Sequence, residues 1–263
     1  MMRSIDINST ETLKKEGKSF YWASFFLPQN SKKNAGILYS ICRYFDDIAD
    51  EKYEDQTKYL EDSIIDIKNN ENNTVNIFLK RNEIHKSIFI DLIEGLILDQ
   101  KKIKIKNIEE LIKYSYHVAG TVGLMMSKII GVKHKNAARS AIDLGIGMQL
   151  TNIARDVYED AQMKRIYLPA SWIPNISLTY LKNSNVYNNE KDNEISSAIN
   201  KTINLSEKFY KNGFAGLKYI PFSTRLGIFI AANVYKGIGI KIRKNKKKYF
   251  RERVYLNLFE KSF

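Results

Sequence analysis

Two segments that place carboxylates inside apolar, helix-patterned sequence constrain this chain more than any other feature. In the first, Tyr39–Glu51 (YSICRYFDDIADE), Asp46 and Asp50 lie one turn apart on one face of a helix. Asp47 follows Arg43 by one turn. Because apolar side chains fill most of the remaining circumference, these carboxylates would be buried and would repel one another without a cation to neutralise them.

The second segment, Gly145–Pro169, repeats this pattern of oxygen-bearing side chains. Asn152, Asp156 and Asp160 recur every four residues, which places them along one stripe of a helix. Arg155 adds positive charge within the same stretch. A single DDxxD motif is more often a solvated acidic face with ordinary i to i+4 pairing. Two such stripes in one chain are better explained by an interior site.

The chemistry of these side chains indicates a hard cation together with phosphate. Oxygen ligands without His or Cys suit Mg²⁺, which binds through a few carboxylates and the phosphate oxygens of a substrate. Arginine forms bidentate hydrogen bonds with phosphate oxygens. Two acidic helices facing each other across a bundle could hold Mg²⁺ and one or two diphosphates between them. The residues themselves therefore predict a diphosphate site.

Six motifs, taken in chain order, resemble those of the squalene and phytoene synthase family. They are SFYWASFFLP, CRYFDDIADE, YSYHVAGTVG, QLTNIARDVYEDAQMKRIYLP, AANVY and RERV, and they fall between Ser19 and Val254. The resemblance implies an all-α, isoprenoid synthase-type helical bundle around a central cavity, with residues 1–263 as a single domain. It also implies head-to-head condensation of two allylic prenyl diphosphates.

The same resemblance implies roles for individual residues. The expected metal ligands are the oxygen donors of the two acidic segments: Asp46, Asp50, Asn152, Asp156 and Asp160, with Asp47 beside them. The expected catalytic residues are Asp46, Asp47, Asp50, Asp156, Asp160 and Tyr116. The expected substrate-binding residues are Ser19, Phe20, Tyr39, Arg43, Gln149, Arg155, Arg165, Tyr235 and Arg253.

The substrate and the cofactor are narrower expectations. Small side chains at Ala119, Gly120 and Gly123 favour room for a long chain, and so geranylgeranyl diphosphate, with phytoene formed through a cyclopropylcarbinyl diphosphate as the first step of carotenoid biosynthesis. The alternative is condensation of two farnesyl diphosphates to presqualene diphosphate, dehydrosqualene or squalene. Mg²⁺ is the expected cofactor, with Mn²⁺ as a substitute. NADPH is not expected, because the sequence carries no nicotinamide-binding motif.

Two other classes of function compete with an enzyme. A catalytically silent family member, acting as an assembly factor or prenyl-lipid binder, would have no need for the acids, whereas all six ligand positions here carry oxygen donors. The formal net charge of +13 fits nucleic acid, an anionic membrane surface or a phosphorylated substrate. A nucleic-acid-binding module would explain this charge but not the paired acidic helices, so no nucleic acid is expected. The basic stretch Lys241–Arg253 has no role apart from its arginine, and the oligomeric state is open.

The remaining composition indicates a cytoplasmic protein. The single cysteine, Cys42, allows neither an intramolecular disulfide nor a thiolate metal site, and the three histidines lack metal-ligand spacing. The N-terminal residues lack the apolar core of a secretory signal, and no run approaches the roughly 20 apolar residues of a spanning helix. Peripheral contact with a membrane surface is therefore the most that we expect.

Helical spacing predicts the elements that carry these motifs. We expect helices over Asn107–Ile130, opened by an asparagine cap, and over Lys135–Met163, as one uninterrupted helix. The asparagine-rich stretch Leu178–Glu194 is expected to be a loop. Glycines within VAGTVG indicate a kink or a close helix contact as well as space for a chain. The acid that ends GLILD, Asp99, fits a surface position and a position near the cavity equally well.

Overall fold

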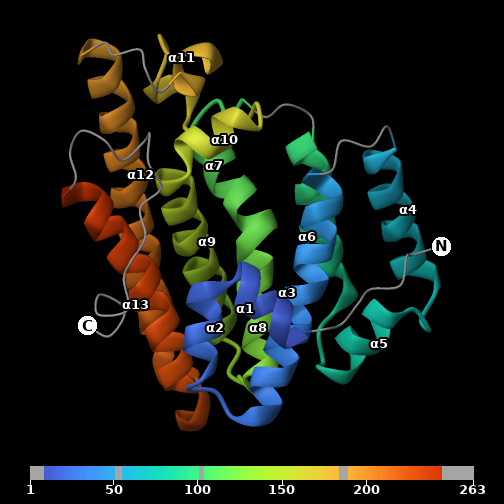
Figure 1. The fold of residues 1–263 in the computed structure, drawn as a ribbon. Helices are drawn as coiled ribbons and strands as arrows, with labels where there is room; N and C mark the ends of the chain where they lie inside the picture. Colours follow the sequence, from blue (N-terminus) through green and yellow to red (C-terminus); the bar gives the residue numbers. More distant parts are fainter. Residues whose placement is uncertain (1–8, 51–54, 101–103, 184–188, 245–263) are drawn as a thin grey trace.

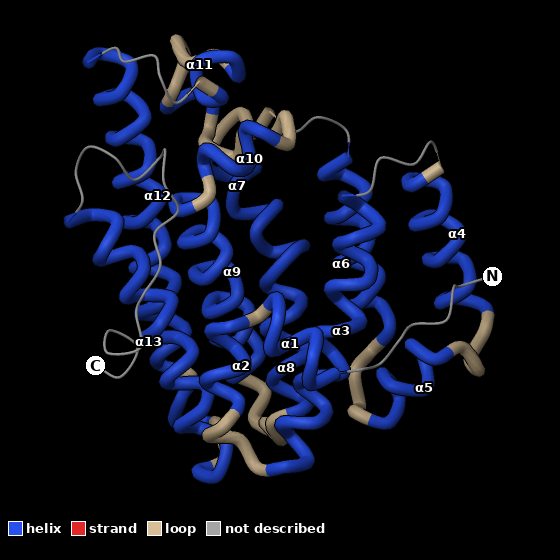
Figure 2. Tube along the Cα trace, in the orientation of Figure 1, coloured by secondary structure: helices blue, strands red, loops and turns tan. Residues whose placement is uncertain are grey.

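The computed structural model describes residues 9–50, 55–100, 104–183 and 189–244, and within them the regular structure is helical (Figures 1 and 2). The β-type pairing among these residues is an isolated bridge between Lys104 and Ile166. The all-α prediction is therefore confirmed. None of the described helices is long and apolar enough to cross a membrane.

The helices alternate with short connections along the chain. In order they are α1 Ser9–Glu16, α2 Lys18–Ser24, α3 Gln29–Asp50, α4 Gln56–Asn69, α5 Thr74–Arg81, α6 Lys86–Gln100, α7 Ile108–Ser115, the π-helical turn η1 Tyr116–Gly120, α8 Thr121–Ile129, α9 Ala137–Arg155, α10 Val157–Gln162, the 3₁₀ turn η2 Ala170–Trp172, α11 Leu178–Lys182, α12 Asn189–Ala215, the 3₁₀ turn η3 Leu217–Tyr219 and α13 Phe222–Lys244.

Helix α9 is central to the bundle. It packs against α8 and η1 on one side and against α12 and α13 on the other (Figure 1). One apolar core lies among α7, α9, α10 and α12, and a second lies among α3, α4, α5, α6 and α8. Helix α3 is buried in the second core, and α9 and α10 in the first, so apolar burial fixes the helices that carry both acidic segments.

The asparagine cap at Asn107 is confirmed, since its side chain accepts a 3.0 Å hydrogen bond from the backbone N–H of Glu110. Three other features of the helices differ from the sequence prediction. The helix that follows is interrupted by the π-helical turn η1, which contains the first glycine of VAGTVG. The expected single helix over 135–163 is broken at Asp156, where φ is −103° and ψ is 21°. The expected loop after residue 177 contains α11 and the start of α12.

The small residues of VAGTVG bring two backbones into contact. A Cβ on Gly123 would overlap the backbone oxygen of Ala141 in α9, and a Cβ on Gly145 would overlap the backbone oxygen of Ala119. The two glycines therefore act as a reciprocal pair that lets α8 and η1 approach α9 closely. Tight packing, the other interpretation of this motif, is thus present. Ala119 and Gly123 also lie along the apolar cavity described below.

Candidate active site

The two acidic segments meet at one end of the bundle, the upper end in Figure 1. The last turns of α3 and α6 and the junction between α9 and α10 lie together there. Arg165, which follows α10, links all of these elements. Its Nη1 lies 2.6 Å from Oδ1 of Asp50 and 3.5 Å from Oδ2 of Asp99. The sequence prediction that the two segments face each other is confirmed by these contacts.

A tight turn positions this arginine. Lys164 takes the left-handed conformation, with φ of 65°, so the chain reverses immediately after α10. The backbone N–H of Arg165 then donates a 2.9 Å hydrogen bond to the carbonyl of Asp160. The bridge between Lys104 and Ile166 holds the next residue against a neighbouring segment. The side chain is therefore directed back across the acidic end, where it is 13% exposed.

Asp99 is a buried member of this end, not a surface acid. It is 6% exposed, and its Oδ1 accepts a 2.6 Å hydrogen bond from the hydroxyl of Tyr167. The ring of Tyr167 stacks on that of Tyr114 with 4.8 Å between centroids. Burial raises the pKa of Asp99, while Arg165 and the tyrosine hydroxyl oppose that shift. Sequence reasoning left Asp99 undecided and missed both tyrosines, although each lies within or beside a recognised motif.

The carboxylates of the acidic end repel one another. Burial raises the pKa of Asp46 to about 7, with the charge of Asp50 adding to the shift and Arg43 opposing it. Burial also raises the pKa of Asp160 well above its ordinary value, and the charges of Asp156 and Asp99 act in the same direction. The ionised forms of these carboxylates are therefore disfavoured without a further positive partner, which favours the binding of a cation.

The two arginines that precede the acids are paired with them. Arg43 contacts Asp46 at 3.3 Å and Asp47 at 2.5 Å, as its one-turn spacing predicts. Arg155 donates from Nε and Nη2 to the two oxygens of Asp156, at 2.7 and 2.5 Å. Both arginines balance charge in this structure, so their expected contact with diphosphate stays a prediction.

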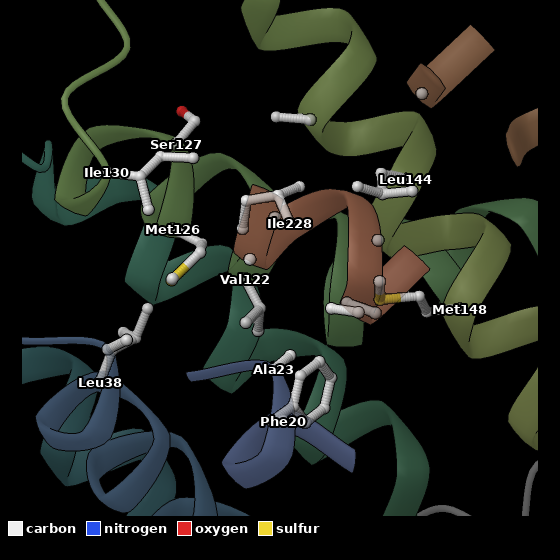
Figure 3. A pocket seen from close by; sticks show the side chains of 18 of the residues that line it. Phe20, Ala23, Leu38, Val122, Met126, Ser127, Ile130, Leu144, Met148 and Ile228 are labelled. Atoms are coloured by element: carbon white, nitrogen blue, oxygen red, sulfur yellow. The ribbon is translucent and has the colours of Figure 1, made fainter. Parts of the chain in front are cut away.

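An apolar cavity of about 310 Å³ lies below the acidic end. Figure 3 shows the side chains of Leu38, Met126, Leu144 and Met148 facing it. Four of the predicted site residues are part of its lining: Phe20, Tyr39, Gln149 and Asn152. The cavity therefore joins the predicted diphosphate end to a hydrocarbon-lined interior.

Asn152 lies where the acidic end and the cavity meet. Its Nδ2 donates a weak 3.4 Å hydrogen bond to Oε1 of Gln149, while its Oδ1 is buried without a hydrogen-bond partner. An unpaired buried oxygen is costly unless a ligand satisfies it. Within residues 9–50, 55–100, 104–183 and 189–244, no three His, Cys, Asp or Glu side chains are close enough to hold a metal by themselves. The oxygen-only donors and this unpaired amide oxygen suit a hard cation that also takes ligands from its substrate.

The other predicted site residues are placed as follows. Ser19 is half-buried on α2, and Tyr235 is buried with its ring 5.2 Å from that of Phe20. Tyr116 does not line the cavity, because its hydroxyl donates a 2.9 Å hydrogen bond to Asp91 on α6. Its catalytic role stays a prediction. Arg253 lies outside the described residues.

The raised pKa of Asp46 leads to a stability prediction. Between the ordinary carboxyl pKa and about 7, the folded state binds more protons at Asp46 than the unfolded state, so the metal-free fold loses stability as pH rises through this window. Asp46→Asn removes this effect. The side chain is still 46% exposed, so solvent reduces both the cost of burying its charge and the repulsion from Asp50, and we expect a gain of about 1 kcal/mol in the free energy of unfolding at pH 7.

Urea unfolding of the metal-free protein at pH 5 and pH 7.5 measures this gain. The substitution should stabilise the fold at pH 7.5 and by a smaller amount at pH 5, because pH 5 lies in the lower part of this window. Asp62→Asn, on the exposed surface of α4, is the matched control and should change neither. Loss of stability in Asp46→Asn at pH 7.5 would show that the Arg43 contact outweighs the repulsion.

Comparisons with known proteins find relatives that match nearly the whole chain. The family model described as squalene/phytoene synthase matches residues 13–260. The 15-cis-phytoene synthase of Paracoccus sp. is 29% identical over 96% of this chain and 87% of its own length. The 15-cis-phytoene synthase of Pantoea ananas is 30% identical over 90% of this chain and 82% of its own length.

Solved structures share the fold. A crystal structure of a dehydrosqualene synthase in complex with ligand superposes with a TM-score of 0.82 at 26% identity, covering 97% of this chain and 91% of that one. The squalene synthase from Alicyclobacillus acidocaldarius gives a TM-score of 0.77 at 20% identity, covering 92% and 94%. Together with the motifs and the acidic end above the apolar cavity, these matches show that the chain belongs to the squalene/phytoene synthase family of prenyltransferases.

Proposed function

We propose that this protein condenses two molecules of geranylgeranyl diphosphate head to head to give phytoene, and that it does so with Mg²⁺. The observation that carries the proposal is the apolar cavity that begins at Asn152, directly below the converging carboxylates of α3, α6 and α9–α10. A cation bound at the acidic end would offset the negative charge of the diphosphates, and the apolar cavity fits the prenyl chains. The relatives named phytoene synthase support this choice of product.

The residues that would hold the metal are Asp46, Asp50, Asn152, Asp156 and Asp160. Bound there, Mg²⁺ would supply the positive charge that stabilises a departing diphosphate. Arg165 already bridges Asp50 and Asp99 at this end, and its planar guanidinium is suited to phosphate oxygens that come within reach.

The proposed reaction has two parts. Ionisation of one prenyl diphosphate releases diphosphate and leaves an allylic cation, which the double bond of the second substrate attacks; loss of a proton then gives a cyclopropylcarbinyl diphosphate. Its own ionisation, rearrangement and loss of a second proton give the hydrocarbon, with no reductant needed. The cavity protects the cations, because its lining below Gln149 and Asn152 is apolar and keeps water out. The rings of Phe20 and Tyr39 lie on that lining and can face positive charge.

The depth of the cavity supports the longer substrate. Along α9 the lining extends from Asn152 to Ala137, and the 15 steps of helical rise between these residues correspond to about 22 Å. With carbon–carbon bonds of about 1.5 Å, the main chain of an extended C20 prenyl group covers about 20 Å and that of a C15 group about 15 Å. The cavity is therefore long enough for a geranylgeranyl chain.

Product analysis tests the proposal directly. The full-length protein is incubated separately with geranylgeranyl and farnesyl diphosphate, each with Mg²⁺, with Mn²⁺ or with EDTA, and each with and without NADPH. We expect phytoene from the C20 substrate with Mg²⁺, no product with EDTA, and no effect of NADPH. Turnover of farnesyl diphosphate alone would contradict the substrate assignment, and absence of turnover of either would favour a silent prenyl-lipid binder.

A C15 reaction is the second candidate. It is favoured by the structural likeness to the dehydrosqualene synthase, which superposes with a TM-score of 0.82. Dehydrosqualene formed from farnesyl diphosphate in the experiment above would establish it. The acidic end would then have the same role, with only the deep part of the cavity left unfilled.

Filling the deep end of the cavity should change the preference for chain length. Ile228 on α13 faces the cavity (Figure 3) and packs against the cluster that contains Ala137, at the other end of α9 from Asn152. Ile228→Trp should lower kcat/KM for the C20 substrate at least tenfold relative to the C15 substrate, because a shorter chain does not reach this depth. Steady-state kinetics with both substrates measure the ratio. Ile240→Trp, on the exposed face of the same helix, should leave it unchanged, and equal losses with both substrates in Ile228→Trp would contradict the proposed depth.

A further inference from the structure

The end of the bundle opposite the carboxylates exposes large apolar side chains. Phe222 is 88% exposed and Leu226, one turn further along α13, is 52% exposed. Phe25 and Phe26, in the connection between α2 and α3, are also exposed. These four residues are called the end patch below. Clustered exposed aromatic and aliphatic side chains of this size indicate a binding surface.

The two halves of the end patch belong to one surface. Gly227 of α13 and Leu27 are packed so closely that a Cβ on the glycine would overlap the leucine side chain. Their sequence neighbours Leu226 and Phe26 therefore lie at the same end, which is the lower end in Figure 1. The apolar surface is thus built from two segments that are distant in sequence and fixed against each other.

Positive charge surrounds the end patch. The Nζ atom of Lys32 lies 4.1 Å from the centroid of the Phe25 ring, and Lys33 and Lys133 are exposed nearby on the same end. Residues 17–45, 128–142 and 208–244, which include the segments at this end, contain no Asp or Glu. Glu83 is the acid that lies beside these lysines, in an adjoining groove. Aromatic side chains mixed with lysines complement an anionic lipid surface.

The deep end of the cavity lies directly behind the end patch. Leu27, which lines the cavity, directly follows the exposed Phe26, and Ile228, which also lines it, follows the exposed Leu226 by two residues. We propose that the end patch docks on an anionic bilayer, with its aromatic side chains in the lipid interface and its lysines against the headgroups. On the proposed function, this orientation brings the hydrocarbon end of the active site to the phase in which prenyl chains and a hydrocarbon product dissolve.

Charge favours a bilayer over a second copy of the chain. Two copies meeting through their end patches would bring Lys32, Lys33 and Lys133 of both molecules together. Like charges at a contact are unfavourable, and the formal net charge of +13 adds to the repulsion. An anionic lipid surface supplies the opposite charge.

Vesicle co-sedimentation of the full-length protein without substrate tests the docking. Vesicles of phosphatidylglycerol and phosphatidylcholine in equal amounts are compared with vesicles of phosphatidylcholine alone. We expect binding to the anionic vesicles that weakens with added salt, and a loss of affinity of at least tenfold in the double variant Phe222→Ser/Leu226→Ser. The matched control is Ile65→Ser/Ile77→Ser, which removes two side chains of 55% exposure from α4 and α5 and should bind as the unmodified protein does.

Three results would overturn the proposal. They are absence of binding to anionic vesicles, equal weakening in the control, and dissociation of a dimer by the Phe222→Ser/Leu226→Ser substitutions in sedimentation without lipid. Lys32→Glu/Lys33→Glu is a second test that leaves the apolar side chains intact, and it should weaken binding to the anionic vesicles specifically. Because these readouts need no turnover, their failure is distinguishable from failure of the proposed reaction, which product analysis in detergent measures separately.

Discussion

Asp156→Ala should lower turnover of prenyl diphosphate by about 10³-fold or more while the protein stays folded, since charge stabilisation at a leaving group is worth several kcal/mol. Asn152→Ala should have an effect of the same order. Asp156 is paired with Arg155 at the break between α9 and α10, and Asn152 presents the unpaired buried oxygen one turn before it. The expected loss is in kcat, because the leaving diphosphate gains charge as its bond breaks.

Steady-state assays at saturating Mg²⁺ measure this loss, and circular dichroism monitors the fold. Glu94→Ala is the control, because it removes an exposed carboxylate from α6, five residues before Asp99, and should keep normal turnover. Near-normal activity in both Asp156→Ala and Asn152→Ala would exclude the proposed metal site. Loss of helix content would point instead to a structural role.

Gly123→Ala should lower the free energy of unfolding by about 3 kcal/mol, and Gly123→Leu by more, because overpacking against backbone cannot be relieved by a rotamer change. A Cβ at this position would overlap the carbonyl oxygen of Ala141, so α8 and α9 would have to separate. From the sequence alone, the room assigned to Gly123 predicts that leucine there would depress use of the C20 substrate more than that of the C15 substrate. The structure predicts general destabilisation instead.

The comparison is with Gly239→Ala in α13. There a Cβ would lie 3.6 Å from Ile203, an ordinary contact, so the substitution should stabilise the helix by about 0.5–1 kcal/mol. Thermal and urea unfolding of both variants measure the difference. Equal behaviour of the two would mean that the close approach of α8 to α9 is not needed for the fold.

The sequence determined the fold class and the spacing of the acidic side chains along their helices. Apolar periodicity with carboxylates at one-turn spacing specified buried helices that carry acids, and such local patterns depend only on residues three or four positions apart. The pairing of Arg43 with Asp47 is of this kind, and the structure confirms it. The asparagine cap at Asn107 is another local feature that the sequence was sufficient to predict.

Helix breaks were only partly visible in the sequence. The stripe of Asn152, Asp156 and Asp160 keeps its one-turn spacing because backbone hydrogen bonds still join each member to the next, at 2.9 and 2.8 Å. The non-helical conformation of Asp156 leaves no mark in that spacing. Periodicity therefore located the side chains correctly but not the end of α9.

Only the tertiary structure decided which distant residues share the site. Asp99 and Tyr167 are separated by 68 positions and meet through a 2.6 Å hydrogen bond, and Arg165 reaches Asp50 across 115 positions. Tyr116 carries a motif signal, yet its hydroxyl is held by Asp91 away from the cavity lining. Sequence spacing gives the direction of a side chain relative to its own helix. The packing of α3, α6 and α9 decides what that side chain contacts, because contacts between helices depend on how the whole bundle buries its apolar surface.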